Sequence, residues 1–124
     1  MAHEFCWIEM TTDNPGAARE FYTSLFDWSF DEMEMAQGGT YAMFQPAGGG
    51  PGGGLMAKPA AEVPTAWTPY VAVDDLAAAC SRVRRLGGQV LMDQTPVPGH
   101  GAFAIIADPT GAVLGLWKNE VAAD

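Results

Sequence analysis

Glu9 is the first residue of this chain whose type and position could support chemistry. It lies in residues 4–12, EFCWIEMTT, which alternate loosely between apolar and polar residues and are rich in strand formers. A carboxylate on a strand that otherwise looks buried needs a partner. Glu9 could be a general base or the counter-ion of a cationic ligand. Two structural interpretations compete, in which Glu9 pairs with an arginine or lies at an open seam of the sheet.

Strand alternation places further side chains on shared faces. Trp7 shares a face with Glu9 on the first strand. On later strands the expected pairs are Tyr41 with Met43, Thr68 with Tyr70, and Phe103 with Ile105. Together these residues would make an aromatic, apolar pocket with a few polar groups, which is the usual build of a small-molecule site. In the alternative, the aromatic side chains only fill the core.

Two helices are expected between the strands. Asn14 followed by Pro15 is a helix start, because Asn caps the first turn and Pro suits the first helical position. The apolar stripe of this helix is Ala18, Phe21, Tyr22 and Leu25. Asp74-Asp75 offers the cap of the second helix, whose stripe is Leu76, Ala79, Cys80, Val83 and Leu86.

The order of elements repeats along the chain. Each half is expected to run strand, helix, strand, strand, strand, and the second half begins about 60 residues after the first. The expected boundaries are 4–58 for the first repeat, 59–66 for a linker and 67–118 for the second repeat. We expect residues 1–124 to form a single domain, because each repeat alone would leave one sheet face uncovered.

Composition excludes several classes of protein. The chain has 15 acidic and 6 basic residues and a net charge of −9, which argues against nucleic-acid binding. The charge favours a soluble protein that attracts cations or basic small molecules, or it serves solubility alone. No membrane helix or secretory signal is recognisable, so a cytoplasmic location is expected. The two cysteines, Cys6 and Cys80, are too few for a zinc cluster and are expected to be reduced core residues.

Three motifs carry a resemblance to a known family. They are TTDNPGAAREFYTSLFDW at 11–28, YVAVDDLAAACSRVRRLGG at 70–88 and ADPTGAVLGLW at 107–117. In this order they resemble the vicinal oxygen chelate superfamily, which includes glyoxalase I, extradiol dioxygenases and the fosfomycin and bleomycin resistance proteins. The resemblance implies an α+β fold of two βαβββ repeats forming paired half-barrels that enclose a cavity.

The resemblance also implies where a metal would bind. Metal-dependent members of this superfamily place His, Gln or Glu on the first and last strand of each repeat. The corresponding positions here are Trp7 or Ile8, the region 53–56, Thr68 and Gly115. None of these offers a donor suited to a divalent metal ion, and the single carboxylate of Glu9 is not a metal site. We therefore expect neither a metal nor another cofactor.

The favoured interpretation is a metal-free small-molecule-binding protein that sequesters a hydrophobic or basic compound and forms a homodimer. The first alternative is an enzyme. It would be a metal-independent isomerase, epimerase or lyase that uses Glu9 with Tyr41 or Tyr70 for proton transfer. It could instead be a glyoxalase-like lyase, isomerase or dioxygenase whose metal ligands lie at positions other than those named above. The second alternative is a structural or regulatory dimer whose interior is filled by side chains.

Overall fold

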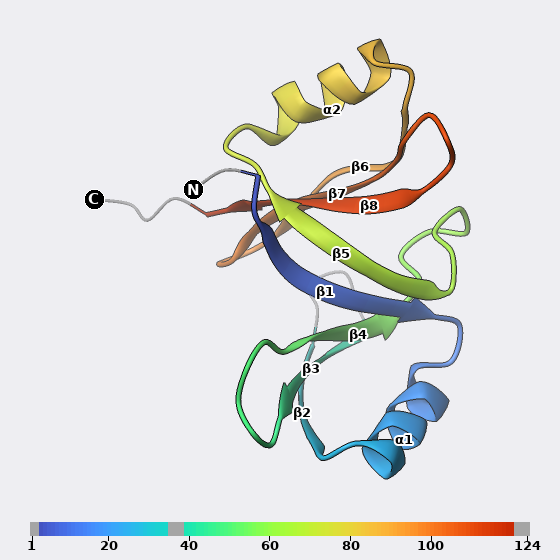
Figure 1. Cartoon of the computed structure of the whole chain (residues 1–124), viewed down its shortest axis with the longest axis vertical. Coiled ribbons are helices and arrows are strands. Elements are labelled where there is room, and N and C mark those ends of the chain that lie inside the picture. The colour runs from blue at the N-terminus through green and yellow to red at the C-terminus, as the bar shows by residue number, and fades with distance from the viewer. Residues whose placement is uncertain (1–2, 35–38, 121–124) are drawn as a thin grey trace. The chain divides into compact units, whose positions relative to one another are not determined.

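The computed structural model describes residues 3–34 and 39–120 (Figure 1). Contacts within the chain define two compact units. The N-terminal unit comprises residues 7–68, and the C-terminal unit comprises residues 1–6 and 69–124. The single domain expected for the whole chain stays a prediction.

The N-terminal unit is one βαβββ module. Its elements are β1 (Phe5–Thr12, of which the first two residues belong to the other unit), α1 (Pro15–Leu25), β2 (Trp28–Glu34), β3 (Thr40–Pro46) and β4 (Gly53–Ala57). The strands lie in the order β2-β3-β4-β1, as can be followed in Figure 1. The β1–β4 pair is parallel, and the other two pairs are antiparallel.

The C-terminal unit repeats this plan. Its elements are β5 (Ala66–Ala72, of which the first three residues belong to the N-terminal unit), α2 (Leu76–Arg85), β6 (Gln89–Val97), β7 (Gly101–Ala107) and β8 (Val113–Asn119). Their order is β5-β8-β7-β6, and β5 pairs with β8 in parallel. The predicted α+β class with two βαβββ repeats is confirmed.

Each helix begins after a residue whose side chain accepts a hydrogen bond from an amide of the first turn. The Asn14 side chain accepts a hydrogen bond from the Ala17 amide, and Pro15 occupies the first turn. The cap of α2 is Asp75, whose carboxylate accepts from the Ala78 amide. The cap therefore falls on the second residue of the Asp74-Asp75 pair.

The two helices differ in what they bury. Leu76 and Cys80 of α2 are buried in the core of the C-terminal unit. By contrast, α1 contains no buried residue, and Phe21 and Leu25 are 59% and 57% exposed. The apolar stripe predicted for α1 is thus wrong at these two positions. Tyr22 faces the sheet instead of Phe21, because neighbouring residues on a helix point about 100° apart.

An aromatic cluster explains why α1 needs no larger apolar face. The rings of Trp28 and Phe44 are stacked with centroids 4.4 Å apart, and Trp67 meets both edge-on. The Trp67 indole also donates a hydrogen bond of 3.1 Å to the Tyr22 hydroxyl. Rings of this size bury much apolar area per residue, so a few of them stabilise the contact between helix and sheet.

One expectation about the surface, the burial of Cys6, is wrong. Cys6 is exposed rather than buried, because the exposed start of β1 precedes its buried half, which begins at Glu9. The linker expected at 59–66 stays a prediction, and within it Val63 is only 1% exposed. The Thr11 hydroxyl donates a 2.8 Å hydrogen bond to the Pro64 carbonyl, which ties this segment to β1.

Candidate functional site

A chain of hydrogen bonds joins three of the predicted site residues in the N-terminal unit. The Tyr41 hydroxyl donates to Oε2 of Glu9 at 2.9 Å. The same hydroxyl accepts from Nε1 of Trp7 at 2.8 Å. Glu9 is 7% exposed, so its carboxylate is held in a largely dry environment. The sequence predicted that Trp7 and Glu9 share a face, and Tyr41 reaches the same face from β3.

A glycine makes this arrangement possible. Gly54 on β4 lies opposite Glu9 on β1 and opposite Met43 on β3. A Cβ built on Gly54 would overlap the Tyr41 hydroxyl and lie 2.7 Å from its Cε2 atom. The tyrosine therefore crosses β4 directly above Gly54 to reach Glu9. Any larger residue at this position would push the ring away.

The surroundings keep the Tyr41 phenol protonated. Burial raises the pKa of Tyr41 far above its ordinary value, and the nearby Glu9 carboxylate raises it further. The hydrogen bond from Trp7 opposes this effect only in part, because it favours the phenolate. At neutral pH, Tyr41 is consequently a neutral hydrogen-bond donor to Glu9.

The surface that carries Trp7, Glu9 and Tyr41 is called the Glu9 face below. Residues adjacent to these point the other way, and Met10, Ala42 and Leu55 form a buried cluster with Ala18 of α1. Helix α1 thus covers the opposite side of the sheet and takes no part in the Glu9 face.

Two further predicted residues lie in the N-terminal unit outside the hydrogen-bonded chain. Met43 is half-buried and pairs with Gly54 in the β3–β4 ladder. Thr68 is 4% exposed and lies in the first half of β5. Their part in ligand binding stays a prediction.

The remaining two predicted residues, Tyr70 and Phe103, lie together in the C-terminal unit. Their rings meet edge to face with centroids 6.3 Å apart. Tyr70 pairs with Gly115 across β5 and β8, and a Cβ on Gly115 would overlap the Tyr70 ring. Tyr70 in the second repeat thus corresponds to Glu9 in the first, since each pairs with a glycine on the last strand of its own repeat.

The sequence reasoning missed the role of the two glycines. The sequence indicated Gly115 only as a missing metal ligand, and Gly54 only as part of the region 53–56, which also lacks a metal donor. A glycine inside a strand can indicate close approach of another group. That signal was available at both positions, but the approaching side chain comes from a different strand and could not be identified.

The donor groups do not suit a metal ion. Among residues 3–34 and 39–120, no three side chains of His, Cys, Asp or Glu gather as a metal site would require. In the N-terminal unit, the family-implied positions are Trp7 or Ile8 on β1, residues 53–56 on β4 and Thr68 on β5, and none of them carries an imidazole or a carboxylate. In the C-terminal unit, the implied position on β8 is Gly115. Divalent ions need imidazole or carboxylate donors, which these residues do not provide.

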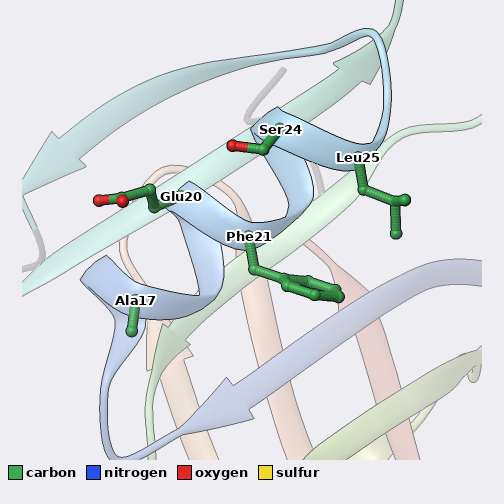
Figure 2. Close-up of a pocket in the computed structure, with 5 residues that line it drawn as sticks. All are labelled: Ala17, Glu20, Phe21, Ser24 and Leu25. Atoms are coloured by element: carbon green, nitrogen blue, oxygen red, sulfur yellow. The ribbon is translucent and has the colours of Figure 1, made fainter.

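A shallow hollow lies along α1, and no residue of the Glu9 face lines it. Figure 2 shows its lining side chains, which all project from this helix and are Ala17, Glu20, Phe21, Ser24 and Leu25. None of the site residues predicted from the sequence lines it.

No helix in the described parts of the chain is long and apolar enough to cross a membrane.

Comparison with curated proteins finds relatives at moderate identity. The chain is 37% identical over 115 residues to the protein named "Putative glyoxylase CFP32" of Mycobacterium tuberculosis, covering 90% of this chain and 44% of that protein. It is 31% identical over 133 residues to the anthracycline biosynthesis protein DnrV of Streptomyces peucetius, covering 93% of this chain and 46% of that protein. The chain thus spans about half the length of these relatives.

Solved structures share the fold at low identity. A hypothetical protein from Bacillus halodurans matches with a TM-score of 0.65 and 15% identity, covering 100% of this chain and 99% of that one. Methylmalonyl-CoA epimerase from Mycobacterium tuberculosis matches with a TM-score of 0.62 and 18% identity, covering 94% and 88%. The sequence model of one family also matches residues 5–116, nearly the whole chain. The chain belongs to the Glyoxalase/Bleomycin resistance protein/Dioxygenase superfamily.

Proposed function

We propose that this chain binds a small hydrophobic or basic molecule at the Glu9 face without the help of a metal ion. The observation that carries the proposal is the buried Glu9 carboxylate, held by Tyr41 and through it by Trp7. Burying a carboxylate is costly, and a protein that retains one in an aromatic setting often uses it. Relatives named for glyoxylase activity and anthracycline biosynthesis are consistent with a small-molecule ligand.

Charge and ring chemistry favour a ligand with a protonated amine on an aromatic body. The carboxylate of Glu9 would face the ammonium group, and the rings of Trp7 and Tyr41 would contact the apolar part and the cation. The net charge of −9 would raise the local concentration of such a ligand. The half-buried Met43 and the buried Thr68 are further proposed contacts in the same unit. Tyr70 and Phe103 are proposed as ligand contacts within the C-terminal unit.

The test compares a cationic probe with its neutral isostere. We expect 1-naphthylmethylamine to raise the melting temperature of the wild type and 1-naphthylmethanol to do so less at the same concentration. Glu9→Gln preserves the size of the side chain and removes its charge, so it should weaken binding of the amine at least tenfold. Equal affinity of both proteins for the amine, or no shift with either probe at millimolar concentration, would refute the proposal.

A second candidate is an enzyme that moves a proton. The contact between a carboxylate and a protonated phenol favours it, because Glu9 could accept a proton and Tyr41 could donate one. We would incubate the protein with hydroxyacetone in D₂O and follow its α-proton signals by NMR. Exchange by the wild type that Glu9→Gln abolishes would support an enzyme, and equal exchange by both proteins would exclude Glu9 as the base.

We also propose that the chain forms a homodimer. Strands β2 and β6 each have a neighbouring strand on one side only, which leaves backbone groups available for pairing. Closed two-fold assemblies are the commonest arrangement of soluble oligomers. Sedimentation equilibrium at micromolar concentration should give twice the mass of 13.1 kDa. A single species at the monomer mass would contradict this proposal.

A further inference from the structure

We infer that Tyr41 and Tyr70 are the residues that exclude a metal ion from this chain. Each ring fills the space that a carboxylate side chain on the last strand of its repeat would need. The inference rests on the proposed metal-free function and adds its physical cause. Packing would then prevent a metal-binding side chain from occupying these positions. A single substitution that introduces such a side chain would not create a metal site.

The first instance is Tyr41 over Gly54. The ring carbon Cζ and the hydroxyl would overlap a Cβ at this position, and Cε2 would lie 2.7 Å from it. Cβ atoms essentially never approach other heavy atoms closer than 3.0 Å, so even an alanine requires the ring to move. The ring is held by two hydrogen bonds, to Glu9 and from Trp7. A glutamate at position 54 would therefore have to break this chain before it could reach a metal.

The second instance is Tyr70 over Gly115. A Cβ at Gly115 would overlap the ring edge of Tyr70 and lie 2.6 Å from its Cγ atom. Because Cγ is the root of the ring, rotation of the ring about its own axis does not remove this clash. The ring is also 3% exposed and packs against Phe103. The same arrangement thus occurs independently in both units, with the tyrosine on β3 in one and on β5 in the other.

The test rebuilds a donor set within the N-terminal unit. Trp7→His and Gly54→Glu place an imidazole and a carboxylate on the Glu9 face, beside Glu9 itself. Side chains at alternate positions of one strand and at the opposed position of the next are close enough to share an ion. One protein carries these two substitutions with Tyr41 retained, and its matched partner carries Tyr41→Ala as well.

Cobalt(II) is the probe, because its visible absorption reports coordination directly. We expect the protein with Tyr41→Ala to bind Co²⁺ at least tenfold more tightly than the one that retains Tyr41. Circular dichroism and thermal unfolding would verify that both are folded. Equal affinities would overturn the inference, and so would failure of the folded triple variant to bind Co²⁺.

A double-mutant cycle tests the packing without any metal. Gly54→Ala should lower the melting temperature of the wild type by at least about 4 °C. In the Tyr41→Ala background the same change should be neutral or stabilising, because the clash is gone and glycine is unfavourable inside a strand. Equal effects in both backgrounds would overturn the inference. Binding of 1-naphthylmethylamine does not enter this cycle, so the proposed function can fail while the exclusion by Tyr41 stands.

Discussion

The hydroxyl of Tyr41 can be removed without changing the packing of its ring. Tyr41→Phe deletes the 2.9 Å hydrogen bond to Glu9 and the 2.8 Å hydrogen bond from Trp7. A hydrogen bond to a charged group contributes roughly 1.5–3 kcal/mol and one between neutral groups roughly 0.5–1.5 kcal/mol. The free energy of unfolding at pH 7 should therefore fall by about 2–4.5 kcal/mol.

The same variant should change how stability depends on pH. The phenol of the unfolded chain ionises near its ordinary pKa of 10, whereas burial keeps the pKa of Tyr41 well above this value in the folded protein. Above pH 10 the folded state thus binds more protons, and stability falls as pH rises. The loss should be about 1.4 kcal/mol per pH unit for one group. It should be absent from Tyr41→Phe, which has no hydroxyl to ionise.

Urea unfolding followed by circular dichroism measures both effects, at pH 7 and in steps from pH 9.5 to 11. Tyr22→Phe is the matched control, because the Tyr22 hydroxyl accepts one hydrogen bond from Trp67 and contacts no carboxylate that the structure defines. It should cost less than half as much at pH 7. A loss below about 0.5 kcal/mol for Tyr41→Phe, within the usual range of surface substitutions, would refute the reasoning. Equal slopes for wild type and Tyr41→Phe above pH 10 would refute it as well.

Three further substitutions test the fold. Thr11→Val should lower the free energy of unfolding by about 1 kcal/mol, since it removes the hydrogen bond to Pro64 at constant side-chain volume; urea unfolding that matches the wild type would contradict this. Leu76→Ala should cost about 2–4 kcal/mol because Leu76 is 2% exposed, whereas Leu25→Ala on the exposed face of α1 should cost under about 1 kcal/mol; similar losses would be inconsistent with the different burial of the two helices. Hydrogen bonds from Thr110 and Ala112 lower the pKa of Asp108, so the stability from this carboxylate is present at neutral pH and is lost as pH falls below 4. Asp108→Asn should therefore make the melting temperature depend less on pH in that range. Thermal unfolding between pH 7 and 3 measures this, and the same pH dependence in the variant and the wild type would contradict the prediction.

The repeat and the helix caps could be predicted because they depend on local sequence. Asn14-Pro15 fixes a helix start through a side-chain hydrogen bond and a pre-set φ, and both are properties of neighbouring residues. The burial of α1 could not be predicted in the same way. Phe21 and Tyr22 are equally apolar in pattern, and the stack of Trp28 on Phe44 decides which of them faces the sheet. That stack joins strands whose register the sequence does not reveal.

For the candidate site, the sequence could predict only which residues of each strand point to the same face. Alternation correctly placed Trp7 beside Glu9, because residues two apart on a strand point the same way. It could not show that Tyr41 crosses β4 to reach Glu9, which depends on the β1–β4 and β3–β4 registers together. Gly54 has this role only because those registers bring it beneath the phenol.

The two repeats carry the same geometry with different chemistry. Glu9 and Tyr70 each lie opposite a glycine of the last strand of their repeat, but only Glu9 carries a carboxylate that can accept a proton or pair with a cation. In the first repeat, Tyr41 of β3 covers Gly54 and donates a hydrogen bond to Glu9. In the second repeat, Tyr70 has the position that corresponds to Glu9 and covers Gly115 directly. A carboxylate in both places would put two buried charges in the molecule at twice the cost of desolvation. The proposed ligand-binding function therefore places the chemistry of the chain in its first repeat. It predicts that substitutions there alter ligand binding more than the same substitutions in the second repeat.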